Sequence, residues 1–295
     1  MCIRDREREM YDQVTLKLNV DPWILSALKE DITSEDVSTN SVMPHPQAGE
    51  VDLICKEDGI ICGLQVFERV FTLLDEKTTV EFLVQDGAEV HKGQLMAKVH
   101  GDIRTLLCGE RTALNYLQRM SGIATMTAKY MERLKGLKTK VLDTRKTTPG
   151  MRMLEKEAVR IGGGMNHRIG LFDMILLKDN HVDFAGGIAN AINKANEYIK
   201  ANHKDGMKIE IEVRNFDELD EALATGHVDR IMLDNFTPEN TKKAVDIVAG
   251  RCELESSGGI TFDTLRDYGE CGVDYISVGA LTHSVKGLDM SFKAC

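Results

Sequence analysis

The sequence predicts an α/β protein in which a mixed segment of helices and strands precedes an α/β barrel. After residue 134, short apolar segments recur, and helical segments lie between the later ones. Such an alternation predicts parallel strands joined by crossover helices. Six or more units at this spacing favour a barrel over an open sheet, although their number alone does not determine closure. Each apolar segment also ends in polar or charged residues, which points to a site at one end of the barrel.

The first third of the chain is expected to mix helices with short strands. A proline at the first helical position favours a helix that starts at Asp21-Pro22. Turns at Asp86-Gly87 and Lys92-Gly93 separate short strands. The expected elements are a helix from Asp21, strands within 50–61, a helix over 65–74, strands within 80–101 and a long helix over 110–134.

The barrel strands carry polar residues where each of them ends. The expected strands are Val141-Leu142, Met174–Leu177, Ile209–Val213, Ile231–Leu233, Leu254 and Tyr275-Ile276, with helices over 189–200, 217–225, 238–248 and 261–271. In the third strand Glu210 and Glu212 share one face, because side chains alternate along a strand. Two carboxylates directed into a barrel mouth are costly unless they bind something, so we interpret this edge as a site.

Composition excludes several classes of protein. Apolar residues make up 42% of the 295 residues, charged residues make up 28%, and the net charge is −10. This balance is ordinary for a globular protein, and no apolar run approaches the ~18 residues of a membrane span. An acidic chain disfavours nucleic acid and anionic membranes as partners. Seven cysteines without a CxxC pair indicate reduced thiols and a cytoplasmic location.

A local cationic cluster stands out against the acidic whole. Its members are Arg145, Lys146, His167, Arg168 and Lys178, with Arg111 on the long helix. Such a cluster favours an anionic small ligand, since arginine forks match carboxylate and phosphate groups. Glycine turns at Ser257-Gly258-Gly259 and Ser277-Val278-Gly279 offer backbone N–H groups to phosphate. Glu212 and Asp234 add oxygen ligands suited to Mg²⁺ or to ribose hydroxyls.

Each of these features alone also has a structural explanation. Single cations are commonly solvated, and glycine clusters are commonly loops. No HExxH motif or zinc-like Cys/His spacing occurs, so a transition metal is not expected. The joint placement of the polar residues on successive strand ends is what favours a site.

Several long motifs resemble quinolinate phosphoribosyltransferases, also called carboxylating nicotinate-nucleotide pyrophosphorylases. The resemblance covers nearly the whole chain from about Val20 onward. Its motifs are ERTALNYLQRMSGIAT (110–125), DTRKTTPGMR (143–152), AVRIGGGMNHRIGL (158–171) and LLKDNH (176–181), followed in order by IEIEV, IMLDN, LESSGGI and DYISVGALTHSVKGLDMS.

The resemblance implies a type II phosphoribosyltransferase fold, an incomplete α/β barrel with an N-terminal α/β sandwich domain. The implied domains are the sandwich over 11–116, the barrel over 117–281 and a C-terminal segment, 282–295, that returns to the sandwich. Residues 1–10 match nothing in the family, and we interpret them as a disordered or artefactual tail.

The implied reaction transfers phosphoribosyl from 5-phosphoribosyl 1-pyrophosphate to quinolinate. Decarboxylation accompanies the transfer and gives nicotinate mononucleotide, pyrophosphate and CO₂, in de novo NAD biosynthesis with Mg²⁺. The resemblance further implies a homodimer or larger homo-oligomer in which Arg111 reaches the neighbouring subunit's site.

The resemblance also implies roles for single residues. Quinolinate carboxylates are assigned to Arg111, Arg145, His167, Arg168 and Lys178, and the donor's pyrophosphate or phosphate to Lys146 with Lys178. Glu212 and Asp234 are expected at the ribose hydroxyls, directly or through Mg²⁺. Thr147 is expected to bind substrate, and the 5-phosphate is assigned to Ser257, Gly258, Gly259, Ser277, Val278, Gly279 and His283. The catalytic set would be Lys146, Glu212 and Asp234.

Three alternatives remain at this stage. One is the molybdenum-associated paralogue of the same fold, against which the RKT and NHR motifs argue. Another is a nicotinate phosphoribosyltransferase without decarboxylation, which would not need arginines for a second carboxylate. A non-catalytic phosphosugar-binding protein is the third, and the retention of Lys146, Glu212 and Asp234 argues against it.

Overall fold

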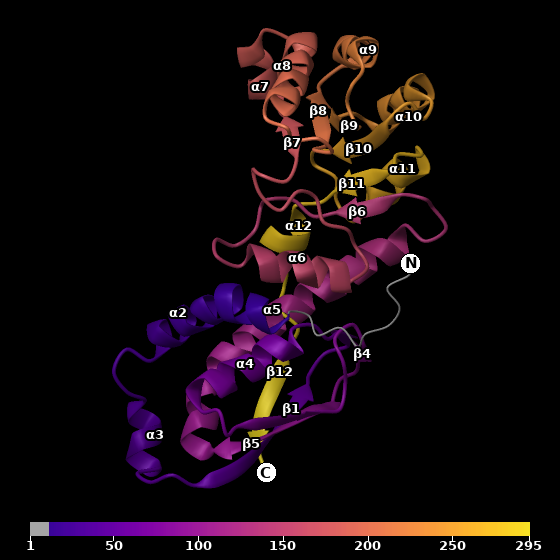
Figure 1. Ribbon diagram of the computed structural model, residues 1–295. Helices are drawn as coiled ribbons and strands as arrows, with labels where there is room; N and C mark the ends of the chain where they lie inside the picture. Colours follow the sequence, from indigo (N-terminus) through magenta and orange to yellow (C-terminus); the bar gives the residue numbers. More distant parts are fainter. Residues whose placement is uncertain (1–11) are drawn as a thin grey trace, which may run out of the picture. The chain divides into compact units, whose positions relative to one another are not determined.

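The computed structural model describes residues 12–295, which divide into two compact units (Figure 1). Among the described residues, unit 1 contains 12–126, 148–162 and 284–295, and unit 2 contains 127–147 and 163–283. The domain boundaries expected from the sequence, 116/117 and 281/282, remain predictions, because this division into units does not test them. The expected tail over residues 1–10 lies outside the described residues.

Unit 1 is built on an antiparallel sheet in the order β12-β1-β5-β3. Its strands are β1 (Ala48–Cys55), β3 (Thr79–Phe82), β5 (Leu95–Asp102) and β12 (Met290–Ala294). The last strand comes from the C-terminal end of the chain and pairs with β1, with Val51 opposite Ala294. A short ladder joins β2 (Gly59–Ile60) to β4 (Glu89–Val90). Gly87 and Gly93 have positive φ, as the predicted turns require.

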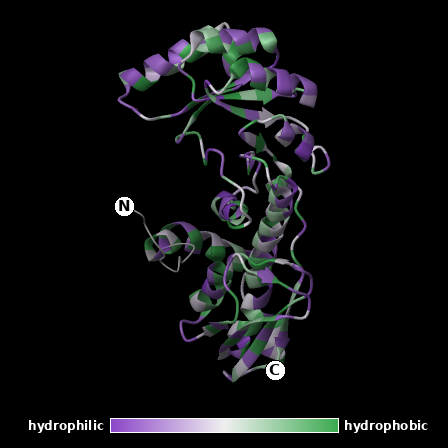
Figure 2. Cartoon of the chain, turned by 90° about the vertical axis from the view of Figure 1, so that its right-hand side faces the viewer, coloured by the Kyte–Doolittle hydropathy of each residue, from purple (hydrophilic) through white to green (hydrophobic). Residues whose placement is uncertain are grey.

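The helices of unit 1 are amphipathic and cover an apolar core. They are α1 (Gln13–Thr15), the π-helical turn η1 (Leu16–Val20), α2 (Asp21–Asp31), α3 (Val37–Val42), α4 (Leu64–Leu74), α6 (Arg152–Ile161) and the part of α5 (Ile103–Arg133) up to residue 126. Hydrophilic and hydrophobic residues alternate along them (Figure 2). Phe67 and Phe71 of α4 contact Phe292 of β12, with ring centroids 6.0 and 5.6 Å away.

Two details of unit 1 depend on contacts between segments far apart in the chain. Asp21 is the first residue of α2, and its carboxylate accepts two hydrogen bonds from Arg69 of α4, at 2.8 and 2.7 Å. It thereby joins two helices. The segment between Thr148 and Gly162, which carries α6, belongs to unit 1 although it lies between two strands of unit 2 in the sequence.

Asp86 caps helix α4 from a distant turn. Its Oδ1 accepts hydrogen bonds from the backbone N–H groups of Gly63, at 2.7 Å, and Leu64, at 3.2 Å. These groups begin the helix and have no partner within it. Burial nevertheless raises the pKa of Asp86 from 3.8 to about 6, because the carboxylate is poorly solvated there.

Replacing Asp86 with asparagine is expected to stabilise the protein at neutral pH and not at acid pH. Between about pH 4 and pH 6 folded Asp86 retains a proton that the unfolded chain releases, so ionisation lowers the free energy of unfolding as pH rises. Asp86→Asn keeps the acceptor oxygen and removes this cost, up to about 3 kcal/mol. Urea unfolding of both proteins at pH 4 and pH 7 measures the difference. A difference that stays constant with pH would contradict the prediction.

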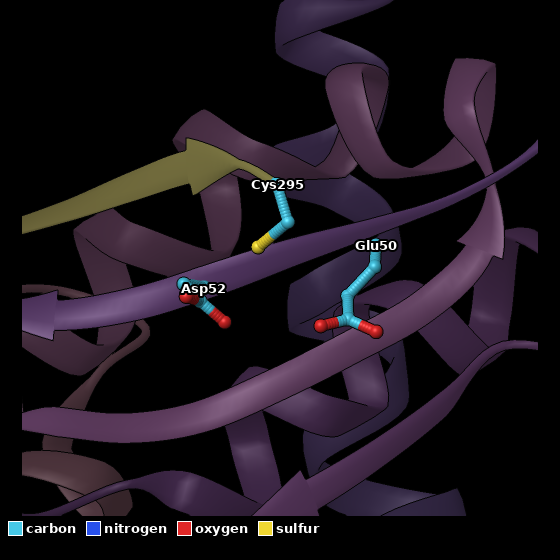
Figure 3. A group of neighbouring side chains, drawn as sticks. All are labelled: Glu50, Asp52 and Cys295. Atoms are coloured by element: carbon cyan, nitrogen blue, oxygen red, sulfur yellow. The ribbon is translucent and has the colours of Figure 1, made fainter.

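One face of this antiparallel sheet carries a small charged cluster (Figure 3). Glu50 and Asp52 of β1 lie near the Cys295 thiol that follows β12. Lys98 of β5 places its Nζ 2.6 Å from Glu50 and 3.2 Å from Asp52. The lysine ammonium therefore neutralises these carboxylates, and we interpret the cluster as an ion-pair group on the sheet surface.

Unit 2 is built on six parallel strands in the order β6-β11-β10-β9-β8-β7. They are β6 (Lys140–Leu142), β7 (Ile175–Leu177), β8 (Ile209–Val213), β9 (Arg230–Asp234), β10 (Glu253–Ser257) and β11 (Tyr275–Ser277). Within the described chain β6 and β7 are the two edges, so the sheet stays open there. The predicted incomplete barrel is confirmed.

The helices of unit 2 follow the strands. They are α7 (Asp179–Ala185), α8 (Ile188–Ala201), α9 (Phe216–Thr225), α10 (Pro238–Val248), α11 (Leu265–Glu270) and α12 (Ala280–His283). The helix predicted over 261–271 is shorter, because Thr261 and Thr264 hydrogen-bond to each other's backbone in a preceding turn. No helix within residues 12–295 is long and apolar enough to cross a membrane.

Candidate active site

The carboxyl ends of the six parallel strands lie along one edge of the sheet in unit 2, and the predicted site residues gather there. The structure places Arg145, Lys146 and Thr147 after β6, Lys178 after β7, Glu212 in β8, Asp234 at the end of β9, Ser257, Gly258 and Gly259 at β10, and Ser277, Val278, Gly279 and His283 at β11 and α12. His167 and Arg168 precede β7. Arg111 belongs to unit 1 and is not part of this cluster.

Two carboxylates and a lysine interact at the ends of β7, β8 and β9. Burial raises the pKa of Glu212, the negative charge of Asp234 raises it further, and Lys178 lowers it. Asn235 donates a hydrogen bond from Nδ2 to Asp234 Oδ2, at 2.8 Å. The two acidic groups therefore lie within electrostatic reach of one another, as a pair that shares a cation would.

A glycine turn joins the ends of β9 and β10. Gly258 has φ +96°, and a Cβ atom there would lie 2.2 Å from Asn235 Oδ1. Asn235 itself has a positive φ of 56° and donates its N–H to Ser257 O, at 2.9 Å. Only glycine fits at position 258, because of its positive φ and the close approach of Asn235.

A second turn brings cationic groups over the end of β11. A Cβ atom on Gly279 would lie 3.0 Å from His283 Nε2 and 3.1 Å from Lys146 Cδ. Thr282 keeps Lys146 next to this turn, because its Oγ1 donates a hydrogen bond to the backbone oxygen of Lys146, at 2.8 Å. A backbone turn flanked by lysine and histidine is suited to a phosphate group.

Two arginines lie near one another beside these turns. Burial lowers the pKa of half-buried Arg168, and the positive charge of Arg145 lowers it further. Arg168 donates from one guanidinium nitrogen to Met174 O, at 3.4 Å, and Arg145 is exposed. Like charges held together in this way favour the binding of an anion between or beside them.

His167 is buried and directed into the protein. Its Nδ1 accepts the backbone N–H of Arg168, at 2.7 Å, and its Nε2 lies 3.1 Å from Glu210 Oε2 and 3.5 Å from Glu255 Oε2. Both ring nitrogens thus face groups of the protein, and the expected contact of His167 with a substrate carboxylate stays a prediction. Burial raises the pKa of Glu210 to about 7 and of Glu255 to about 8.

Sequence reasoning missed three residues behind the site. The Asp143 carboxylate accepts a hydrogen bond from the backbone N–H of His167, at 2.8 Å. The guanidinium of Arg230 donates a hydrogen bond to the carboxylate of Glu255, at 3.2 Å. For Glu255 a signal was present, because Glu253, Leu254 and Glu255 alternate as residues of IEIEV do. The neighbours of these charges depend on strand order, which local patterns do not reveal.

Together these features define an enzyme site of the α/β-barrel class for a small, multiply anionic molecule. Paired arginines offer contacts to carboxylates, two glycine turns offer N–H groups to phosphate, and Glu212 with Asp234 offers oxygen ligands.

Comparison with known proteins identifies the family within this class. Residues 36–121 and 123–293 match the N-terminal and C-terminal domains described as quinolinate phosphoribosyl transferase. The probable carboxylating nicotinate-nucleotide pyrophosphorylase of Bacillus subtilis is 44% identical over 262 residues, which cover 89% of each chain. The chloroplastic Arabidopsis thaliana relative of the same designation is 43% identical, over 90% of this chain and 80% of its own.

A solved structure agrees with these sequence relationships. The crystal structure of NadC from Streptococcus pyogenes superimposes with a TM-score of 0.89 at 44% identity, covering 96% of this chain and 98% of that one. The chain belongs to the quinolinate phosphoribosyltransferase family. It is an enzyme with the decarboxylating quinolinate phosphoribosyltransferase activity of de novo NAD biosynthesis.

Proposed function

We propose that the strand-end cluster of unit 2 binds quinolinate and 5-phosphoribosyl 1-pyrophosphate side by side and catalyses their reaction there. The observation that carries this proposal is the convergence, on one sheet edge, of the Arg145–Arg168 pair with the Glu212–Asp234 pair. One pair suits the dianionic acceptor, and the other suits the hydroxyl-rich donor.

The acceptor is held by cations. Arg145 and Arg168 bind the two quinolinate carboxylates, and Lys178 adds positive charge beside them. His167, whose nitrogens face Arg168 and Glu210, orients Arg168 beside these carboxylates. Desolvated guanidinium–carboxylate contacts fix the ring so that its nitrogen faces the donor.

The donor occupies the glycine turns and the carboxylate pair. The N–H groups around Ser257–Gly259 and Ser277–Gly279 bind the 5-phosphate with His283, and Lys146 with Thr147 faces the pyrophosphate. Glu212 and Asp234 hold the ribose hydroxyls. Their hard oxygen atoms also fit Mg²⁺, which would neutralise charge on the departing pyrophosphate when bound.

The chemistry follows from this arrangement. The pyridine nitrogen forms a bond to C1 of the ribose as the bond from C1 to pyrophosphate oxygen breaks, and pyrophosphate leaves with the electron pair. The ring nitrogen becomes cationic. The adjacent carboxylate then loses CO₂, its bonding electrons pass to the ring carbon, and a proton from solvent replaces it. Lys146, Glu212 and Asp234 contribute by electrostatic positioning.

An assay with two acceptors tests the proposal. Purified protein is incubated with Mg²⁺, the phosphoribosyl donor and either quinolinate or nicotinate, and nucleotide and CO₂ are measured. We expect nucleotide with equimolar CO₂ from quinolinate alone, and no product after chelation of the metal. Turnover of nicotinate would contradict the two-carboxylate site, and turnover with chelator would contradict the role of Mg²⁺.

We further propose a homodimer in which Arg111 completes the partner's site. Arg111 is exposed on α5 and forms no ion pair with any of residues 12–295, so its charge is available to a group outside the chain. Symmetric dimers exchange such residues reciprocally.

Mixing two inactive variants is expected to restore activity. In the proposed dimer each site combines Arg168 of one subunit with Arg111 of the other. A dimer of one Arg111→Ala subunit and one Arg168→Ala subunit therefore contains one site with both arginines intact. Random exchange at equal concentrations would give about a quarter of wild-type activity. Steady-state rates after co-refolding measure it, with each variant alone as control. Activity no higher than the mean of the two variants would place Arg111 in its own subunit's function.

We place the enzyme in the cytoplasm. The six cysteines of the described chain are all free thiols, as a reducing compartment would keep them. Fractionation of the source cells tests this location.

A further inference from the structure

A charged cluster lies behind the candidate site on the same face of the sheet. Glu210 of β8 and Glu255 of β10 are both 0% exposed, and Arg230 of β9 lies between them. One guanidinium nitrogen of Arg230 lies 3.2 Å from Glu255 Oε2 and 3.6 Å from Glu210 Oε2. Buried carboxyl groups of this kind require compensation when they ionise, and here it comes from one residue on the central strand.

Arg230 is itself fixed on its other side. Glu253 accepts hydrogen bonds from its Nε and a terminal nitrogen, at 3.3 and 3.1 Å. The guanidinium carbon lies 4.1 Å from the centroid of the Tyr275 ring, and the Tyr275 hydroxyl donates to Glu253 at 3.1 Å. Arg230 is therefore held from both sides, with its guanidinium beside the two buried carboxylates.

The carboxylates contact the imidazole of His167. Its Nε2 lies 3.1 Å from Glu210 and 3.5 Å from Glu255, on the side opposite to its contact with the Arg168 backbone. The His167 N–H is fixed as well, because it donates to the fully buried Asp143 at 2.8 Å. Three strands thus determine where the His167–Arg168 dipeptide lies.

We propose that Arg230, Glu210 and Glu255 are positioning residues for quinolinate binding, which act by holding His167 and thereby the guanidinium of Arg168. This inference rests on the proposed function, in which Arg168 binds a quinolinate carboxylate. The cluster never contacts substrate. It acts through the backbone of the His167–Arg168 dipeptide, because the Arg168 side chain can be placed only as accurately as the backbone that carries it.

A double-mutant cycle between Glu255 and Arg168 tests the proposal. Quinolinate dissociation constants are measured by calorimetry without donor, and the KM of the donor is measured separately. We expect Glu255→Gln to weaken quinolinate binding about tenfold and to change the donor KM less than about twofold. In Arg168→Gln the same Glu255 substitution should have little further effect, because the group that it positions is already absent.

A matched control is present elsewhere in unit 2. Glu239→Gln makes the same chemical change at an exposed residue of α10 that pairs with Lys243 and takes no part in this cluster. It should leave the quinolinate dissociation constant within about twofold of wild type. If Glu255→Gln does not fold, Glu210→Gln replaces it in the cycle, since Glu210 contacts the same ring nitrogen.

The outcomes separate the two proposals. Additive losses in the double variant, or equal weakening of donor and quinolinate, would overturn the positioning role. Unchanged quinolinate binding in Arg168→Gln would instead overturn the proposed role of Arg168 itself. Loss of quinolinate affinity in the single variants, with coupling in the double variant, would support both.

Discussion

Arg168→Ala is expected to cost about 2–5 kcal/mol of quinolinate binding, because a desolvated substrate carboxylate would lose its charged partner. The guanidinium is half-buried and lies near Arg145. Because Arg145 has its own role in the proposed site, it does not replace Arg168 when that residue is removed. The loss should fall on the kcat/KM for quinolinate, with little change in the KM of the donor. Steady-state kinetics with each substrate varied in turn measure this separation.

Arg251→Ala serves as the control for Arg168. Arg251 is an exposed arginine of the same unit that donates to the carbonyls of Val248 and Ile247, at 3.1 and 2.7 Å. It lies before β10 and not after a strand end. We expect wild-type kinetics from this variant. Near-wild-type kinetics in Arg168→Ala would remove that residue from the site.

Asp234→Asn is expected to lower kcat by about 10²–10³-fold, as removal of a preorganised electrostatic group does. The side chain keeps its size, but the negative charge next to Glu212 is lost. The variant should need more Mg²⁺ for half-maximal rate, because only Glu212 still offers an anionic ligand. Rates measured across a Mg²⁺ titration at saturating substrates give both quantities.

Asp246→Asn makes the same substitution on α10. Asp246 is exposed and pairs with Lys242 at 3.0 Å, an interaction of little energetic value. Its kinetics and Mg²⁺ dependence should equal those of the wild type. An Asp234→Asn enzyme with unchanged rate and unchanged Mg²⁺ requirement would show that the donor does not depend on this carboxylate.

Local sequence signals were sufficient for most elements. The helix predicted from Pro238 to Val248 has those bounds in the structure, because a threonine cap and a proline in the first turn define its start. The strand IEIEV shows why the site edge was predictable, since alternation places Glu210 and Glu212 on one face whatever the strand's neighbours are. The glycines at 258 and 279 mark turns that a side chain would obstruct.

Other features depended on which strands become neighbours. Arg230 could not be assigned from its own segment, because its partners Glu210, Glu253 and Glu255 come from strands on both sides. The same holds for His167, whose predicted contact with substrate came from its place in a motif. Its burial and its distance to Glu210 arise only when β8 and β10 are in place.

The sequence by itself determined the strand–helix alternation, the strand-end cluster and the family. These depend on residue spacing within short segments, which backbone geometry converts directly into faces and turns. The tertiary structure alone decided the order of the strands in the sheet, the assignment of α6 to unit 1, and the burial of His167. These depend on contacts between residues far apart in the chain, and local periodicity carries no information about such contacts.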